Sequence, residues 1–347
     1  WRGQGWQVKN LFELKNARRV LVEGNLMEYA WQDAQSGYAV LLTPRNQGGT
    51  APWSVVSDVT FTNNVIRHAA GVIQVVGYDN NATSQQTRRI TIRNNLAYDI
   101  DPAAWGNYTK AILIGEGPSD VVIDHNTIMH AASSLVYAHG TRQMTGFVFT
   151  SNVAPHGHYG IMGQNAQPGN YTINTYFPSA VVTYNVMQGG AAASYPVPNA
   201  FPTLAEWQAS FADVANDDYR LLTSSVFYAA GAGGSVPGAD LGQLQAALGG
   251  AGSPPVQGPV APPPSTNTPP VARPGGPYAA APGAPFMTDG SASSDAEGAI
   301  ASFTWRWHDD IVIYADDVPA ADIAGSAWQR VTVADGAGGG AILNPDR

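Results

Sequence analysis

Short apolar runs recur along the first half of the chain, and an asparagine follows each of them after one intervening residue. Five of these runs read "VLVE", "VTFT", "ITIR", "VVID" and "FVFT", and each has the length and β-branched composition of a strand. The recurring asparagines are Asn25, Asn64, Asn95, Asn126, Asn152 and Asn185, with spacings of 39, 31, 31, 26 and 33 residues. Repeats of this length are typical of solenoids.

Each repeat contains further apolar runs after its asparagine. The last run of each repeat reads "GYAVLL", "GVIQVV", "KAILIG", "SLVYAHG" or "YGIMGQ". Three short strands per repeat predict one turn of a parallel β-helix, whose apolar interior becomes continuous only when successive turns stack. Because stacked strands lie ~4.8 Å apart, we expect the asparagines to form a column that binds turn backbone groups and neighbouring asparagines. Asparagine also tolerates the left-handed conformation that such a turn needs.

In this arrangement, residues 6–248 resemble secreted right-handed parallel β-helix proteins of the pectate-lyase-like and polysaccharide-lyase-like kind. The resemblance implies an all-β fold, a right-handed parallel β-helix over residues 1–248 and an extracellular location. That fold hosts lyases, hydrolases, epimerases and non-enzymatic adhesins, so it does not define an activity. From about residue 201 the chain departs from the repeat, and we expect this segment to cap the last coil.

A change of composition marks a second part of the chain. Residues 249–272 are rich in proline and predict an extended linker. Within 273–347, the stretch "GGPYAAAPGAPFMTDGSASSDAEGAIASFTWRW" resembles the first half of a PKD-like β-sandwich, a module common in secreted glycan-degrading enzymes. The following "HDD" departs from the Trp-x-Phe-Gly-Asp-Gly of that family. Two alternatives therefore stay open: "RVTVADGAG" closes the sandwich, or "DIVIYADDVPA" begins a different, truncated module.

Charge and composition exclude several classes of protein. The 17 Lys and Arg against 26 Asp and Glu give a net charge of −9, which argues against a nucleic-acid partner. No apolar run approaches the ~18 residues of a membrane-spanning helix. The absence of cysteine excludes disulfides, thiolate metal sites and a cysteine nucleophile. We expect a processed or trimmed, secreted or cell-surface protein of bacterial origin that is monomeric and has a polysaccharide as its partner.

A polar column is expected along the outer face of the sheet formed by the last run of each repeat, because alternate residues of a strand point outward. The predicted substrate contacts in this column and its adjoining loops are Gln74, Tyr78, Asp79, Glu116, Tyr137 and Gln164. His139 lies at the same strand ends and is a catalytic candidate. Such a groove would hold a linear, anionic sugar chain, and an ordinary solvated face is the alternative.

The first two coils contain the most specific candidate for a catalytic site. Glu13 and Lys15 in one coil and Arg45 in the next resemble, locally, β-helix lyases that act on alginate and chondroitin. The resemblance implies that Lys15 is the base, Arg45 stabilises the enolate-like charge and Glu13 is a Ca²⁺ ligand. A lysine can remove the proton beside a uronate carboxylate if its pKa is lowered. "TPRNQ" lacks the Arg-His-Gly that often holds the arginine of those lyases.

A second column stands four residues after each ladder asparagine and contains Tyr29, His68, Asp99, His130 and His156. His68, Asp99, His130 and His156 form an alternative cluster, either a metal or acid–base site or a set of turn residues that satisfy the backbone. No pair of carboxylates has the spacing that glycoside hydrolysis needs. The function we predict is β-elimination in a uronate-containing polysaccharide. The alternatives are a non-catalytic glycan-binding or adhesion protein and a structural repeat protein.

Overall fold

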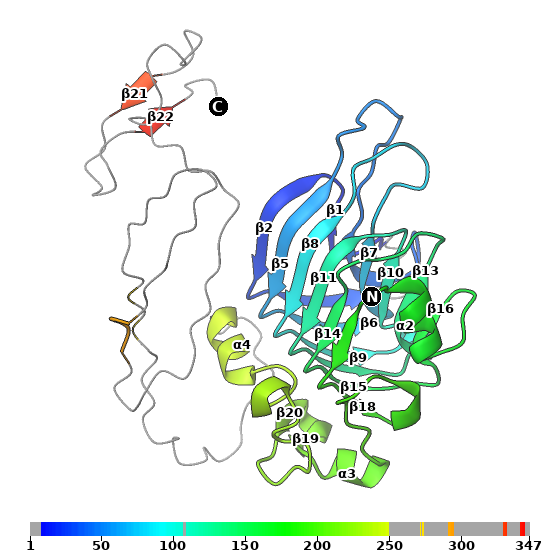
Figure 1. Cartoon of the computed structure of the whole chain (residues 1–347), viewed down its shortest axis with the longest axis vertical. Helices are drawn as coiled ribbons and strands as arrows, with labels where there is room; N and C mark the ends of the chain where they lie inside the picture. Colours follow the sequence, from blue (N-terminus) through cyan, green and yellow to red (C-terminus); the bar gives the residue numbers. More distant parts are fainter. Residues whose placement is uncertain are drawn as a thin grey trace. The chain divides into compact units, whose positions relative to one another are not determined.

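The computed structural model describes residues 8–106, 109–249, 271, 273 and 291–294, together with the backbone of Gln329–Val331 and Ala341–Leu343. The chain forms two compact units, Trp1–Gly258 and Pro259–Arg347. The first unit contains three parallel sheets of six strands each (Figure 1). Across the described ranges, no helix is long and apolar enough to cross a membrane.

The chain passes through the three sheets in turn and advances by one strand in each sheet per round. Sheet A consists of β1 (Phe12–Leu14), β4 (Tyr38–Leu42), β7 (Gly71–Val76), β10 (Ile112–Gly115), β13 (Ser134–His139) and β16 (Gly160–Gly163). Sheet B consists of β2 (Ala17–Glu23), β5 (Val56–Thr62), β8 (Arg88–Arg93), β11 (Ser119–Asp124), β14 (Val148–Thr150) and β17 (Val181–Thr183). Sheet C consists of β3 (Leu26–Ala30), β6 (Val65–Ala69), β9 (Leu96–Ile100), β12 (Thr127–His130), β15 (Val153–Pro155) and β18 (Val186–Gln188). The predicted stack of parallel strands, consistent with a parallel β-helix, is confirmed.

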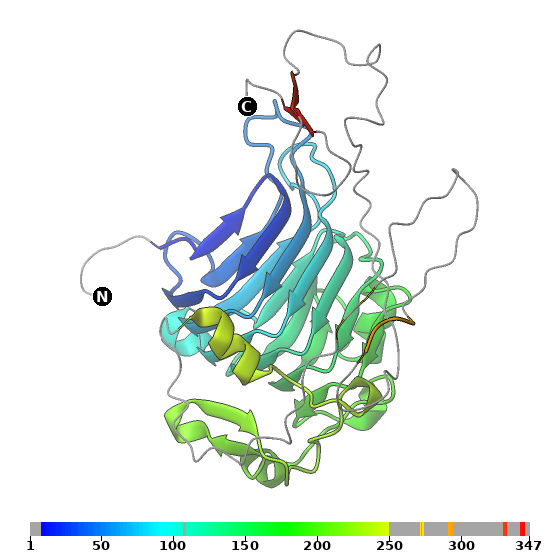
Figure 2. The ribbon, with the colours of Figure 1, turned by 90° about the vertical axis from the view of Figure 1, so that its left-hand side faces the viewer.

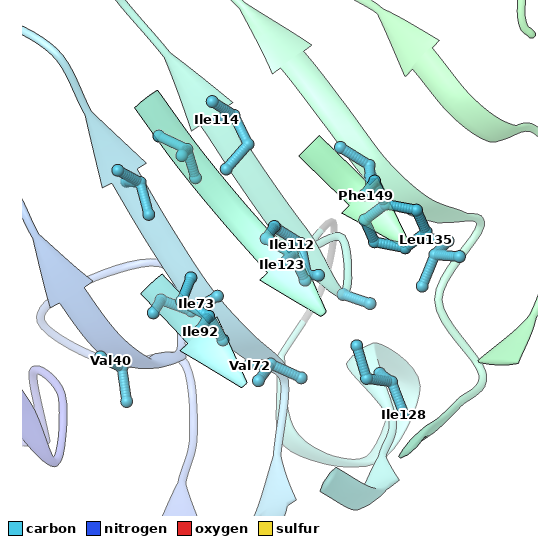
Figure 3. Packing of buried hydrophobic residues seen from close by; sticks show 14 of the residues in the cluster. Val40, Val72, Ile73, Ile92, Ile112, Ile114, Ile123, Ile128, Leu135 and Phe149 are labelled. Atoms are coloured by element: carbon cyan, nitrogen blue, oxygen red, sulfur yellow. The ribbon is translucent and has the colours of Figure 1, made fainter. Parts of the chain in front are cut away.

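Alternate residues of all three sheets point inward and form one continuous apolar core. Val40, Ile73 and Ile112 are in register on neighbouring strands of sheet A and are almost fully buried. Figure 3 shows these residues together with Ile92 of sheet B and Ile128 of sheet C. Each fully buried Val or Ile stabilises the fold by about 1.5–3 kcal/mol, so stacking supplies the apolar burial that a single coil lacks.

The six repeat asparagines form a hydrogen-bonded column at the turn from sheet B to sheet C. The Asn64 side-chain amide donates to the carbonyl of Thr62 in its own coil and to that of Val22 in the preceding coil, at 2.8 and 2.9 Å. Its backbone N–H donates to Asn95 Oδ1 at 2.9 Å. The same pattern continues to Asn185, which in turn donates to Asn199. Asn199 follows a loop and not a full coil, so the repeat pattern did not predict it.

The left-handed position of this turn is the residue before each ladder asparagine. Positive φ angles occur at Gly24, Asn63, Asn94, His125, Ser151 and Tyr184. The ladder asparagines themselves do not adopt this conformation, which corrects the sequence-based expectation. Their side chains are instead placed to bind the backbone of two coils at once.

The segment from 201 to 249, which we expected to cap the last coil, packs along the outer face of sheet C. It contains α3 (Leu204–Gln208), the antiparallel pair β19 (Phe211–Asp213) and β20 (Asp218–Leu221), and α4 (Leu241–Leu248). Its apolar residues join an outward column of sheet C that includes Val65, Leu96 and Val186. Helix α4 reaches the first coils (Figure 2), where a Cβ on Gly24 would lie 2.4 Å from Ala247 O. An apolar outer face needs such a cover, because exposed apolar surface is unfavourable in water.

The remaining elements are short. They are α1 (Pro102–Trp105), α2 (Asn170–Tyr176), η1 (Ala192–Ser194), η2 (Val214–Asn216) and η3 (Ala232–Gly234) in the first unit, and β21 (Gln329–Val331) and β22 (Ala341–Leu343) in the second. Strands β21 and β22 pair antiparallel, and Val271 pairs with Ser294. Apart from these positions and Gly249, the predicted linker and PKD-like module lie outside the described residues.

Candidate functional site

A groove of about 550 Å³ crosses the outer face of sheet A, over β4, β7, β10 and β13. Its floor includes Gln74, Leu113 and Tyr137, which are in register on neighbouring strands. Loop residues Gln32 and Asn80 are among those that complete its walls. The groove therefore runs across successive coils, in the direction in which a linear polymer could lie along the solenoid.

Four predicted residues line this groove: Gln74, Glu116, Tyr137 and His139. Strand alternation in sheet A places Gln74, Tyr137 and His139 outward, as expected from the sequence. Glu116 follows β10 directly and has positive φ, which turns the chain at the edge of the groove.

The other three predicted substrate contacts do not line the groove. Asp79 is nearly inaccessible, with a side chain only 2% exposed. The ring of Tyr78 lies 4.5 Å from the Arg142 guanidinium. Gln164 accepts a hydrogen bond from the backbone N–H of Gly140 at 3.3 Å. These side chains have local partners in the loops and in the next coil.

Lys15 and Arg45 lie on neighbouring coils, where Arg45 N donates to Lys15 O at 2.9 Å, but their side chains have different partners. Lys15 Nζ lies 3.6 Å from Glu13 Oε2, whereas Arg45 Nη1 lies 3.0 Å from Asp79 Oδ1 and donates to Asn80. Glu13 stands opposite Leu41, two strands or ~10 Å from the groove residue Gln74. None of the three lines the groove.

The Arg45–Asp79 pair organises a loop. Burial acts to raise the pKa of Asp79, but hydrogen bonds from the backbone of Asn81 and Asn46 and from Arg45 outweigh it and lower this pKa. The carboxylate therefore stays charged while it joins two loops of neighbouring coils. This structural role accounts for Arg45 without a substrate.

Lys110 is a charged groove residue that the sequence did not lead us to predict. It stands two residues before the start of β10, and its Nζ donates to Ser133 Oγ at 2.8 Å. Burial lowers its pKa. Nζ also lies 5.9 Å from the centre of the Tyr137 ring. The sequence does offer a signal, a lysine immediately before the apolar run "AILIG", whereas the predicted groove residues come from the middles and ends of such runs and the loops after them.

Tyr137 and its neighbours complete the polar part of the groove. Burial, with a smaller contribution from Tyr176, raises the pKa of Tyr137. The rings of Tyr137 and His139 lie 6.4 Å apart, and His139 Nδ1 lies 3.7 Å from Glu116 Oε1. The pKa of Lys110 is thus lowered and that of Tyr137 is raised. More of the lysine is therefore in the neutral form that can accept a proton, while the phenol keeps the proton that it can donate.

The alternative cluster does not stay together. His68 and Asp99 form a pair, whereas His130 and His156 have other partners. His68 Nδ1 lies 2.6 Å from Asp99 Oδ2, which also accepts from Trp105 Nε1 at 3.2 Å. The His68 ring stacks on Tyr29, so this pair belongs to an aromatic corner of sheet C. His130 does not join it, because the pairing of β12 with β9 shifts register between Ile128 and His130.

The shift places His130 opposite Ile100, in an inward column and not beside Asp99. Burial lowers its pKa to about 4, and Nε2 lies 2.8 Å from Pro155 O. His156 lies between Gly157 O and the Tyr195 hydroxyl, at 2.8 and 2.7 Å, and burial lowers its pKa as well. These contacts give both histidines a structural role in the later coils.

No three His, Asp or Glu side chains of the described residues are grouped closely enough to hold a metal ion. The nearest approach in the groove is the His139–Glu116 pair, which has two members. Glu13, the predicted Ca²⁺ ligand, has Lys15 as its partner.

No protein-family model, no curated protein and no solved structure matches the chain. Any function must therefore be argued from the groove and its chemistry.

Proposed function

We propose that the chain is a secreted right-handed parallel β-helix protein that cleaves a uronate-containing polysaccharide by β-elimination in the groove of sheet A. One observation carries this proposal. Lys110, with a lowered pKa, and Tyr137, with a raised pKa, line the same groove, and Nζ is 5.9 Å from the centre of the tyrosine ring. A base and an acid that line the same groove are the two groups that elimination needs.

The proton balance of the reaction assigns a role to each residue. Neutral Lys110 removes the proton on the carbon beside the uronate carboxylate, and that electron pair forms the new C=C bond. The C–O bond to the neighbouring sugar breaks, and the Tyr137 hydroxyl protonates the departing oxygen. Gln74 and His139 line the same groove and offer hydrogen-bond donors to the carboxylate as negative charge builds up on it.

Hydrolysis by the usual pair of carboxylates receives less support. Glu116 is the one carboxylate among the described residues that line the groove, and His139 lies beside it. Retaining and inverting glycosidases both need two carboxyl groups across the scissile bond. Elimination needs one base and one acid, and Lys110 and Tyr137 supply both.

A non-catalytic glycan-binding protein is the second candidate. It is favoured by the uncharged polar and aromatic lining of the groove, such as Gln74, Asn80 and Tyr137, since these groups bind sugar hydroxyls and stack on sugar rings without chemistry. In either case, the second unit would be a PKD-like accessory module carried by a monomeric, extracellular protein of bacterial origin.

The test is incubation of the full chain with alginate, polygalacturonate or chondroitin in the presence of Ca²⁺. A lyase produces an unsaturated uronate, which is followed by its ultraviolet absorbance. A binding protein would slow in a gel that contains one of these polymers and produce no absorbance. If none of the polymers yields unsaturated product, the lyase proposal is wrong.

A further inference from the structure

A second cavity, of about 780 Å³, lies between the turns that join sheets B and C and the segment from 201 to 249. One wall comes from three successive coils and includes Asn63, Arg93 and His125. The other wall includes Arg220, Tyr228 and Val236. The volume lies within the range of about 300–1,000 Å³ that is usual for small-molecule sites.

The wall from the C-terminal segment is fixed to the coils by hydrogen bonds. Gly238 N donates to Ser151 O at 2.7 Å, and Ala239 N donates to Thr127 Oγ1 at 2.9 Å. Gly238 has a φ of +83°, and a Cβ there would lie 2.6 Å from Thr127 Oγ1. Only glycine fits this approach without strain, so the cavity is built into the fold.

Two arginines, Arg93 and Arg220, line this cavity, and each is paired with an aspartate. Arg93 Nε lies 3.2 Å from Asp124 Oδ2, and Arg220 Nε donates to Asp218 Oδ1 at 2.8 Å. The arginine side chains are 49% and 35% exposed, but those of Asp124 and Asp218 only 19% and 5%. Neither aspartate lines the cavity. Each guanidinium has five N–H groups, so both arginines keep donors for a ligand after pairing.

Several acceptors of the walls already have partners within the protein. Asn63 Oδ1 accepts from Asn94 Nδ2 at 2.6 Å, and Asn94 Oδ1 accepts from Asp240 N at 2.5 Å. Asp240 Oδ1 accepts from the backbone of Gly242 and Gln243, at 2.9 and 3.0 Å. Two guanidinium groups stand against one carboxylate, Asp240, in the lining, and this balance of charge suits a ligand rich in anionic oxygens.

We propose that this cavity is a second binding site, for an acidic saccharide whose carboxylate or sulfate oxygens accept hydrogen bonds from Arg93 and Arg220. The Tyr228 ring offers an apolar surface to the sugar. Planar guanidinium groups from two separate elements select for a planar or multidentate anion better than a single charge would. This site does not depend on catalysis in the groove of sheet A.

The test is isothermal titration of the full chain carrying Lys110→Ala, so that no ligand is consumed. The probes are trigalacturonate, a sulfated glycosaminoglycan disaccharide, inorganic sulfate and neutral maltotriose. We expect binding of at least one acidic saccharide, weakened about tenfold or more by Arg93→Gln or Arg220→Gln. Val236→Trp should weaken it as well by filling the cavity, without removing an ion pair. Arg88→Gln, at the other end of β8, is the matched control and should have no effect.

The inference is overturned if neither acidic saccharide binds, if binding survives both arginine variants and Val236→Trp, or if maltotriose binds as tightly. Binding of inorganic sulfate alone would also overturn it, because the site would then recognise an ion and not a saccharide. Failure of the lyase proposal would appear separately, as missing unsaturated product in the wild-type chain with this binding intact.

Discussion

Each ladder asparagine connects two coils through a single side chain. Asn126 is 1% exposed, and its amide donates to Ile92 O of the preceding coil and Asp124 O of its own, at 2.9 and 3.1 Å. Its Oδ1 accepts from Asn95 N at 3.0 Å. Each such group would be buried without a partner if the side chain were shortened.

The Asn126→Ala variant should therefore be much less stable than the wild type. The loss of several buried hydrogen bonds should reduce the free energy of unfolding by about 2–5 kcal/mol, as measured by urea denaturation. Asn25 belongs to the same ladder but lies exposed at its first coil, so water can replace its bonds. Asn25→Ala is the control and should cost less than about 1 kcal/mol; equal losses would contradict this account.

The opposite pKa shifts of Lys110 and Tyr137 predict the pH dependence of activity. The base must be neutral and the acid protonated, so the rate should rise with pH through the lowered pKa of Lys110 and fall only above the raised pKa of Tyr137. The pH–rate profile should thus have its maximum on the alkaline side of neutrality. A Tyr137→Phe variant that kept the full rate would show that the phenol is not the acid.

At the scale of elements, the regular repeat is interrupted at β12, and this interruption places His130 in the core. One residue, Met129, stands on β12 where β9 has Tyr98 and Asp99, so His130 enters an inward column. Its Nδ1 has no hydrogen-bond partner among the described residues, and the ring is held neutral by burial. Folding therefore favours the uncharged form of this histidine.

Acid should destabilise the first unit through His130. Its pKa falls from 6.5 in the unfolded chain to about 4 in the folded one, so the folded state binds fewer protons between these values. Stability should be complete above about pH 6.5 and decline as the pH falls toward 4, by about 3 kcal/mol from this group. His130→Gln can still donate to Pro155 O but does not titrate. The difference between the urea denaturation curves of the two proteins, taken from about pH 7 to about pH 4, measures this contribution; parallel pH profiles would refute it.

Much of the solenoid could be predicted because its pattern is local and repeated. The spacing of Asn64, Asn95 and Asn126 is sufficient to locate the turns, and strand alternation is sufficient to assign Gln74 and Tyr137 to an outer face. A repeating pattern cannot predict where a single coil departs from the repeat by one residue. The shortened β12 moved His130 away from Asp99 for this reason.

Long-range packing was the second limit. The segment from 201 to 249 has no repeat, and whether it covers an end or a side depends on which apolar face of the coils is left exposed. The groove was predictable where strands formed it and at Glu116, which directly follows β10. Lys110 and Gln32 enter from irregular segments, whereas Arg45 and Asp79 form an ion pair in loops that sequence alone could not place.

At the scale of the whole first unit, the stacking of coils brings side chains of successive coils together in two places. The outer face of sheet A forms the proposed substrate groove, and the turns between sheets B and C meet the C-terminal segment at a second cavity lined by two arginines. A saccharide long enough to reach from one place to the other would be retained between cleavage events under the proposed function, because the second contact is then intramolecular.

The most direct test of the central claim compares the activities of alanine variants of Lys110 and Lys15, two lysines that flank strands of sheet A. Lys110→Ala should reduce the production of unsaturated uronate by about 10²–10⁴-fold, the usual contribution of a general base. Lys15→Ala removes a lysine that pairs with Glu13 outside the groove, and it should keep activity close to that of the wild type. If Lys15→Ala abolishes the activity and Lys110→Ala retains it, the base has been assigned to the wrong coil and the account is contradicted.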